Sequence, residues 1–473
     1  MQPLQIGARR GPLSGAPLDD GTVWAAATAA HVADDISVLR RMRQRDWSFY
    51  HWPSDGSPNL ARVAIDECGR FGLLSGRLAV LLNPGVRIDE LPQQDVTRSR
   101  AAFGTRDCYV IELRNGRSPI AYLAADDVRG KIERSEVEFV RTIPARSEPR
   151  RGLAAQLVDL VRAFSIKKSE PHWTKIGVDG SLDGSGVQIG LIDEGFRDDH
   201  PSISHAFDAA RSMQITCSGA CTFSKTVGRF PKPASSHGTQ CASLIVSKPE
   251  KNGRGPTGLA REATLAAVSI DSDQSPLALA EAVEWLVSIG VDVLSSTVML
   301  NSTTTCNTAS LTLEKAVKDA VANGRKGNGA AVIWAIDSAS GRLETHVVYG
   351  NAGVWPVAAL ESDWQTRHAG LQGAAMLCVA PGFDWRTALA NGGYGNGGGG
   401  HSLAAAVVAG IVGAALGSAS SPPTHSELEA AIRNACCRIG SAPDGIWGSG
   451  LVNLSRTLAD INGTALSSCP SVP

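Results

Sequence analysis

Apolar positions in residues 171–465 fall into two patterns. Continuous apolar runs, typical of strands buried on both faces of a parallel sheet, occur at Val187–Ile192, Leu265–Ile270, Val291–Leu294, Ala331–Ile336 and Ala375–Ala380. Helix-like segments lie among them, at Gln240–Val246, Leu277–Ile289, Ser310–Ala322 and Leu403–Leu416. The alternation predicts an α/β domain, a doubly wound and mostly parallel sheet with helices on both faces.

Residues 76–147 form a smaller unit with a different pattern. Strands are expected at Arg77–Leu82, Cys108–Leu113 and Val137–Ile143, and a helix at Ala124–Ile132. Strands and helices of this number predict a small α+β domain.

Three further segments complete the predicted organisation. Residues 1–75 are an N-terminal extension of unknown role, in which Asp34–Arg45 is expected to form a charged amphipathic helix. Residues 148–170 are rich in charge and indicate a linker, and residues 466–473 form a C-terminal tail.

Charge, segment length and the N-terminal sequence argue against several classes of function. The 473 residues carry a formal net charge of −1, so no electrostatic footprint for nucleic acid or anionic lipid is present. Leu403–Leu416 is shorter than the roughly 20 residues that span a bilayer, and no membrane span is expected. No apolar stretch follows Arg9-Arg10 as in a secretory signal, so the default expectation is a cytoplasmic protein, with leaderless export left open.

The ten cysteines show no metal-binding signature with two matched pairs. In the cytoplasmic location expected by default, mostly reduced thiols are expected, although Cys217 and Cys221 are close enough in sequence for a local disulfide in an oxidising setting.

Three polar residues fall at junctions between predicted elements. Asp193 ends the first apolar strand, His237 starts an apolar helix, and Ser402 lies in the first turn of the helix that follows a glycine-rich loop. Singly, each has an ordinary structural role as turn residue, satisfied histidine or helix cap. Together they supply an alcohol, a base for its proton and a carboxylate that fixes the tautomer of the base.

The segments around these residues resemble the catalytic domain of subtilisin-like serine proteases, the subtilases of peptidase family S8. Ile189–Gly195 is similar to the aspartate motif, His237-Gly238-Thr239 to the histidine motif, and Gly400–Ala404 to the serine motif. The order Asp, His, Ser is that of subtilisin. Supporting stretches agree in order: Gly258–Val268, Val379–Gly382 and Gly448–Asn453.

The resemblance implies roles for the catalytic residues and for the N-terminal region. Ser402 would be the nucleophile, His237 the general base and then acid, and Asp193 its orienting carboxylate. The substrate would be a polypeptide, and no cofactor is required. Structural calcium is common in such proteins, but no acidic loop here has convincing ligand spacing. Residues 76–147 resemble a propeptide, which implies a zymogen whose propeptide blocks its own cleft until cleavage near 146–168.

Other positions depart from the subtilase pattern or add to it. Asp337 stands where an asparagine usually donates to the oxyanion, and an ionised carboxylate cannot donate. We therefore expect slow turnover or better activity below neutral pH. Thr297, Val298 and Met299 replace the usual substrate-binding Ser-Leu-Gly, which predicts a restricted P1 pocket.

Two residues beside the motifs each allow two interpretations. His401, in place of the usual threonine before the nucleophile, is either a second titratable group or a tolerated loop residue. Cys241 resembles the cysteine near the catalytic histidine of proteinase K-like enzymes, although a small core residue is the ordinary role.

Two alternatives compete with an active protease. A catalytically weak or inactive subtilase fold used as a binding module is favoured by Asp337, Met299 and His401. An α/β-hydrolase esterase is disfavoured, because its serine belongs in a G-x-S-x-G motif and His401 follows Gly400 here.

Overall fold

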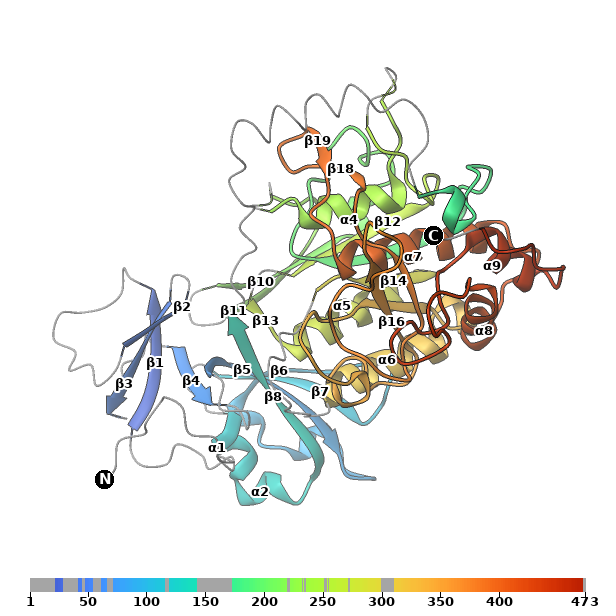
Figure 1. Cartoon of the computed structure of the whole chain (residues 1–473). Helices are drawn as coiled ribbons and strands as arrows, with labels where there is room; N and C mark the ends of the chain where they lie inside the picture. Colours follow the sequence, from blue (N-terminus) through green and yellow to red (C-terminus); the bar gives the residue numbers. More distant parts are fainter. Residues whose placement is uncertain are drawn as a thin grey trace.

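The computed structural model describes residues 22–28, 41–44, 47–53, 61–65, 71–114, 119–142, 172–218, 222–231, 233, 235–250, 253, 255–270, 273–298 and 310–470. Two large sheets organise this part of the chain, one in a C-terminal α/β domain and one in an N-terminal region beside it (Figure 1). The predicted linker 148–170 lies outside the described residues, as do Met299 and Cys221.

The C-terminal domain contains an eight-stranded sheet with parallel neighbours except at one edge. Its spatial order is β11 (Thr222–Val227), β10 (Met213–Ser218), β12 (Thr264–Ile270), β9 (Gln188–Asp193), β14 (Val293–Ser296), β15 (Ala331–Ala335), β16 (Val354–Leu360) and β17 (Cys378–Pro381). Only β11 runs antiparallel to its neighbour. The predicted mixed α/β fold with a mostly parallel sheet is confirmed.

Helices cover both faces of this sheet, as the strand β9 demonstrates. A Cβ added to Gly190 would lie 2.8 Å from Leu286 of α5 (Pro276–Ser288) on one face. The neighbouring Ile189 points to the other face, where it meets Gly413 of α7 (His401–Gly417). Successive strand residues point to opposite faces, so α5 and α7 lie on opposite sides of the sheet.

The helix α7 is the centre of the domain. Its residues from His401 to Ala415 are all buried. Glycine positions permit this burial, because a Cβ at Gly410 would come within 2.7 Å of Leu259 and one at Gly413 within 2.6 Å of Ile189. Small residues thus allow the helix to lie close to the sheet, as the apolar run Leu403–Leu416 predicted.

The remaining helices and strands of the domain surround this centre. They are α4 (His237–Val246), α6 (Leu311–Asn323), α8 (His425–Ala435), α9 (Leu454–Ile461), and the short strands β13 (Asp273–Gln274), β18 (Arg386–Ala388) and β19 (Tyr394–Asn396). A disulfide joins Cys437 to Cys469 and ties residue 469 of the tail to the domain, a pairing that sequence spacing did not predict. Among the described residues, no helix is both long and apolar enough to cross a bilayer.

The N-terminal region is built on β5 (Phe71–Leu82), which pairs antiparallel with both β7 (Cys108–Leu113) and β8 (Ile132–Thr142). The strand β6 (Val96–Ala101) pairs with β7, and the helices α1 (Pro119–Ala124) and α2 (Asp126–Arg129) lie beside the sheet (Figure 1). Its own core contains the buried residues Leu78, Val80, Leu82, Leu91, Ile111, Leu113, Tyr122 and Val128. The single helix expected at 124–132 is wrong: two short helices, α1 and α2, occupy residues 119–129, and Ile132 begins β8.

Four strands before residue 66 extend the same sheet. They are β1 (Thr22–Thr28), β2 (Arg41–Gln44), β3 (Trp47–Pro53) and β4 (Ala61–Ile65), with the order β5-β4-β1-β3-β2. The helix predicted over Asp34–Arg45 is wrong for its described part, since residues 41–44 pair with β3. Cross-strand pairing outweighs the local helical preference there.

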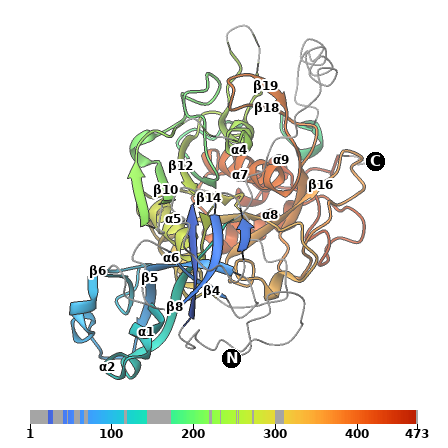
Figure 2. The ribbon, with the colours of Figure 1, turned by 90° about the vertical axis from the view of Figure 1, so that its left-hand side faces the viewer.

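The two sheets meet where β8 ends. Arg141 and Thr142 pair antiparallel with Gln274 and Asp273 of β13, which follows β12 of the large sheet. The pairing joins the N-terminal sheet to the carboxyl edge of the α/β domain, and Figure 2 shows β8 rising from the N-terminal region toward that domain.

Candidate active site

Asp193 is the last residue of β9 and is completely buried. Its Oδ1 accepts from the backbone N–H of Glu194 at 2.6 Å, and its Oδ2 accepts from the hydroxyl of Thr297 at 2.5 Å. Parallel pairing of β12 and β14 on either side of β9 brings these strand ends to one edge. The carboxylate therefore lies at the edge where α/β sheets carry their active sites.

His237 opens the helix α4 and faces this carboxylate. Its Nδ1 lies 2.8 Å from Oδ1 and 3.0 Å from Oδ2 of Asp193. The close approach requires glycine at the next position, because a Cβ on Gly238 would lie 2.3 Å from the carbonyl oxygen of Gly195 and 3.0 Å from the Cβ of Asp193. The His-Gly pair of the histidine motif is thus explained by packing as well as by chemistry.

The environment keeps Asp193 ionised. Complete burial alone would raise its pKa, but the charge of His237 and hydrogen bonds from His237, Thr297 and Glu194 outweigh burial and lower the pKa below its ordinary value. An ionised Asp193 accepts the proton on Nδ1 of His237, which leaves Nε2 as the nitrogen that can take a proton.

Ser402 lies in the first turn of α7, after the cap residue Gly400. Gly400 has φ +122°, a conformation that favours glycine, and this turns the loop into the helix. Ser402 is 5% exposed, and its Oγ donates to the carbonyl of Thr297 at 3.4 Å. The first-turn N–H groups and the helix dipole favour negative charge here.

The structure brings the three predicted side chains to one edge of the sheet. Thr297 contacts two of them, Asp193 through its hydroxyl and Ser402 through its carbonyl. Cys241, one turn after His237, has its Sγ 3.9 Å from the carbonyl oxygen of Ser402. Nε2 of His237 is buried and has no hydrogen-bond partner among the described residues. The Asp–His link is therefore formed, while Ser402 bonds to Thr297 instead of to the imidazole.

The predicted substrate-binding segment follows β14. Thr297 is 2% exposed and bonds to the carboxylate, a contact that its sequence position did not indicate. Val298 is also 2% exposed, and its carbonyl accepts from the indole N–H of Trp334 at 2.9 Å. The large buried side chain of Trp334 thus lies against this segment.

Asp337 follows β15 and is 4% exposed. Its Oδ1 accepts from the N–H of Ala339 at 2.9 Å, whereas its Oδ2 is buried without a hydrogen-bond partner in the described part of the chain. The backbone N–H of Leu371 donates to its carbonyl at 3.0 Å. A buried carboxylate oxygen without a hydrogen-bond partner lowers the stability of the fold, unless a proton or a ligand satisfies that oxygen.

One group of described residues could together hold a metal ion. It consists of Asp193, His237 and Cys241, whose ligand atoms all lie within 4.8 Å of one another. Carboxylate, imidazole and thiolate suit soft or borderline cations such as Zn²⁺. The same side chains would be needed for catalysis, so a metal bound there would compete with the chemistry.

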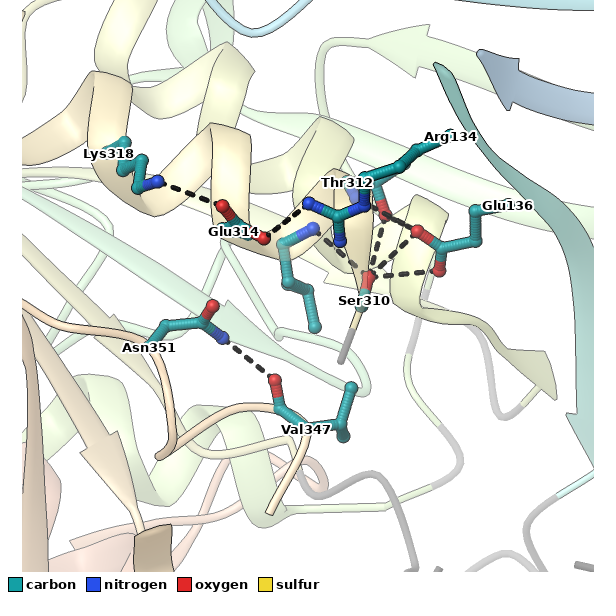
Figure 3. A network of polar contacts seen from close by, with 9 residues as sticks. Arg134, Glu136, Ser310, Thr312, Glu314, Lys318, Val347 and Asn351 are labelled. Atoms are coloured by element: carbon teal, nitrogen blue, oxygen red, sulfur yellow. Dashed lines mark hydrogen bonds and ion pairs between the residues drawn. The ribbon is translucent and has the colours of Figure 1, made fainter. Parts of the chain in front are cut away.

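A second polar network lies where the N-terminal sheet contacts the domain. Glu136 of β8 accepts hydrogen bonds from the hydroxyls of Ser310 and Thr312 and from the N–H of Thr312, all at the start of α6 (Figure 3). Burial raises the pKa of Glu136, although these hydrogen bonds oppose the rise. On the same side, Arg134 pairs with Glu314 of α6 at 3.0 Å. The strand thus supplies a carboxylate to the N-terminus of a helix, where negative charge is favourable.

A buried charge cluster completes this contact. Glu281 of α5 has its Oε1 2.5 Å from Arg77 of β5, 2.9 Å from Arg100 of β6 and 2.6 Å from Lys225 of β11. Glu138 of β8 accepts from the hydroxyl of Ser275, the cap residue of α5. The N-terminal sheet therefore contacts both α5 and α6 through charged and polar side chains.

Solved structures of known proteases share the architecture. Fervidolysin, a keratinolytic enzyme related to subtilisin from Fervidobacterium pennivorans, is similar with a TM-score of 0.55 and 16% identity, over 84% of this chain and 61% of that one. A mutant of the epidermin leader peptide processing serine protease of Staphylococcus aureus is similar with a TM-score of 0.59 and 13% identity, over 81% of this chain and 98% of that one. At these identities, the likeness concerns the fold.

Comparison with protein families gives a more specific result than comparison with single proteins. The search of curated proteins found no match. Residues 184–455, more than half of the chain, match the subtilase family of peptidases. The protein therefore belongs to the subtilase family of serine proteases.

Proposed function

We propose that the protein is a serine endopeptidase that cleaves peptide bonds through an acyl-enzyme on Ser402. The observation that carries this proposal is the hydrogen-bonded pair of Asp193 and His237, 2.8 Å apart, beside the N-terminus of the helix that bears the serine. The shared contacts of Thr297 and Cys241 with these residues support the assignment.

The proposed reaction uses only side chains and water. Oγ of Ser402 attacks the carbonyl carbon of the scissile peptide, while Nε2 of His237 takes the hydroxyl proton. The C–N bond then breaks, and the imidazolium gives this proton to the departing amine. Water attacks the acyl ester in the second half, its proton passes through His237 back to Ser402, and the carboxylic acid leaves. Asp193 fixes the tautomer and stabilises the imidazolium.

Rotation of the Ser402 side chain would complete the catalytic group. In the structure, its Oγ donates to Thr297 over a long 3.4 Å contact, and Nε2 of His237 is without a partner among the described residues. Catalytic hydrogen bonds are often long or misaligned before substrate binds, so a bound peptide would turn Oγ toward the imidazole.

The N-terminal domain, residues 76–147, would act as an inhibitory propeptide in this proposal. Its contacts with the starts of α5 and α6 and the pairing of β8 with β13 support this role. The domain would then block the cleft as an intramolecular inhibitor. Cleavage near 146–168 would release the domain and activate a zymogen.

A fluorophosphonate probe tests the chemistry directly. Wild-type protein is expected to become covalently labelled, and Ser402→Ala is expected to lose all labelling because the attacking oxygen is gone. His237→Ala should label at a much lower rate, since removing one member of such a group costs a factor of roughly 10⁴ or more. Unlabelled wild-type protein from which the N-terminal domain has been cleaved, or equal labelling of Ser402→Ala, would refute the proposal.

Maturation provides a second readout. Mass spectrometry of purified wild-type protein is expected to show a cut between residues 143 and 171, and the Ser402→Ala protein should remain full length. A cut that is independent of Ser402 would indicate another protease and remove the evidence for self-processing.

A second function follows from a specific observation. Asp337 places a buried carboxylate oxygen, unpartnered among the described residues, where an oxyanion donor is expected, and its charge would repel the developing negative charge. A weak or inactive subtilase fold that binds peptides is the corresponding alternative. Peptide binding without probe labelling would support it.

A further inference from the structure

His401, the residue before the nucleophile, is buried with both ring nitrogens engaged. The residue is 3% exposed. Nδ1 lies 2.9 Å from the backbone nitrogen of Ala359, and Nε2 lies 2.9 Å from the carbonyl oxygen of Ala369. The ring also contacts His368, with centroids 5.0 Å apart. These contacts show that His401 is not an exposed loop residue.

The two hydrogen bonds fix the tautomer of His401. A backbone N–H can only donate, so Nδ1 must accept with its lone pair from Ala359. A carbonyl oxygen can only accept, so Nε2 must carry the proton that it donates to Ala369. The imidazole is therefore neutral, with its single proton on Nε2.

These bonds connect the nucleophile to two separate segments. Ala359 belongs to β16, so one bond holds the first residue of α7 against the sheet. Ala369 precedes Gly370, and a Cβ at Gly370 would lie 2.6 Å from the carbonyl oxygen of Asp337 and 2.8 Å from Nε2 of His401. The next residue, Leu371, donates to that same carbonyl oxygen at 3.0 Å. The imidazole thus joins the helix of Ser402 to the segment that fixes Asp337.

The backbone on the other side of His401 is also fixed. The N–H of Gly400 donates to the carbonyl of Gly382 at 2.9 Å. A Cβ on Gly382 would lie 2.7 Å from the carbonyl oxygen of Gly400 and 2.5 Å from the Cβ of Ala359, so these segments approach as closely as glycine permits. The side chain of His401 lies between β16 and Ala369 and forms a hydrogen bond to each.

We propose that His401 is a positioning residue that sets the place of Ser402 and the first turn of α7 relative to the oxyanion site at Asp337. The role rests on the proposed acyl-transfer function and deepens it. A displaced nucleophile slows acylation more than it weakens substrate binding, because the geometry matters most in the transition state. Loss of His401 therefore lowers kcat and leaves KM nearly unchanged.

Three substitutions separate the two bonds. His401→Phe keeps a planar ring but removes both nitrogens, and leaves the N–H of Ala359 without its acceptor. His401→Asn places an oxygen near the Nδ1 position and keeps the bond from Ala359, whereas His401→Gln places an NH₂ near Nε2 and keeps the bond to Ala369. The expected order of kcat is wild type, then both amide variants, then His401→Phe at a loss of about 10²-fold.

The experiment measures kcat and KM on a chromogenic peptide and the rate of fluorophosphonate labelling. His205→Gln, a substitution of an exposed histidine, is the matched control and should behave as wild type. Equal labelling rates and equal kcat for wild type and His401→Phe would overturn the positioning role alone. A wild-type protein without Ser402-dependent labelling would overturn the proposed function itself, and this role with it.

A spectroscopic measurement determines the protonation of His401 directly and does not depend on the activity of any variant. Nitrogen-15 NMR of histidine-labelled protein in the Ser402→Ala background, assigned by comparison with His401→Gln, is expected to show His401 as the neutral tautomer with the proton on Nε2. An imidazolium at neutral pH, or a proton on Nδ1, would contradict the hydrogen-bond arrangement and overturn the proposal.

Discussion

The hydroxyl of Thr297 donates a hydrogen bond of 2.5 Å to Oδ2 of Asp193, and both residues are buried at the carboxyl edge of the sheet. The two residues come from the ends of β14 and β9, which are parallel neighbours. Thr297 thereby connects a segment expected to contact substrate with the carboxylate that orients His237. It also contacts Ser402 through its carbonyl, so that one residue touches both ends of the proposed catalytic group.

Replacement of Thr297 by valine tests this contact with little change of shape. A hydrogen bond to a charged group contributes about 1.5–3 kcal/mol, so kcat/KM is expected to fall roughly 10- to 100-fold. Because the hydroxyl helps to lower the pKa of Asp193, its removal raises that pKa, so the carboxylate loses its charge at a higher pH than in the wild type. The measurement is kcat/KM against pH. Thr297→Ser, which keeps the hydroxyl, is the control, and a valine variant as active as wild type would show that the contact is dispensable.

Replacement of Asp337 by asparagine tests the oxyanion position. Asparagine can keep Oδ1 as the acceptor for Ala339 and places an NH₂ where Oδ2 now has no partner among the described residues. One oxyanion donor contributes about 10²–10³ in rate, so kcat at neutral pH should rise toward that factor.

The informative measurement is kcat of both proteins at neutral pH, with Asp337→Ala as the variant that gains no donor. If Asp337→Asn is no faster than wild type at neutral pH, the position does not serve the oxyanion.

Modification of Cys241 by a mercurial should inhibit the enzyme. Its Sγ lies 3.9 Å from the carbonyl oxygen of Ser402 and within 4.8 Å of ligand atoms of Asp193 and His237, so a metal on sulfur would displace the imidazole. Activity is expected to disappear at one mercury per enzyme and to return with excess thiol. Cys241→Ala should resist inhibition, and mercury bound to Cys241 with full activity would contradict this reading.

The charge cluster at Glu281 should make the contact of the N-terminal sheet sensitive to acid. Burial would raise the pKa of Glu281, but Arg77 and Lys225 lower it to about 2. A lowered pKa contributes stability above the ordinary value of 4.5 that is lost as pH falls toward 2. Thermal unfolding of Ser402→Ala protein, which prevents cleavage, should therefore show a falling midpoint between pH 4.5 and pH 2, and a smaller fall in Glu281→Gln.

Removal of one partner tests the same cluster at neutral pH. Arg77→Ala leaves Glu281 in a buried site with one cation fewer, and such a loss typically costs about 3–5 kcal/mol. The matched control is Arg87→Ala, whose ion pair with Asp89 is on the surface and should give no measurable change. Equal denaturation midpoints for both variants would show that the buried cluster does not hold the two sheets together.

Local sequence patterns were sufficient to predict most of the strands and helices of the α/β domain. The strands β9, β12, β14 and β15 and the helices α4, α5, α6 and α7 lie within a few residues of the predicted segments, because a continuous apolar run or an apolar helix face is itself the cause of burial. The strand β16 was missed, since Val354–Leu360 contains a proline and follows a glycine-rich turn. The pairing of residues 41–44 was missed because it depends on strands elsewhere in the sheet.

The sequence by itself determined which residues could carry the chemistry and the alternation that places Asp193, His237 and Ser402 at element junctions. It did so because strand ends, helix starts and glycine turns are set by neighbours along the chain. The tertiary structure decided the bond of Thr297 to Asp193, the fixed tautomer of His401 and the cluster around Glu281. Those contacts join side chains from separate strands and helices, and only the packing of the sheets determines which of them meet.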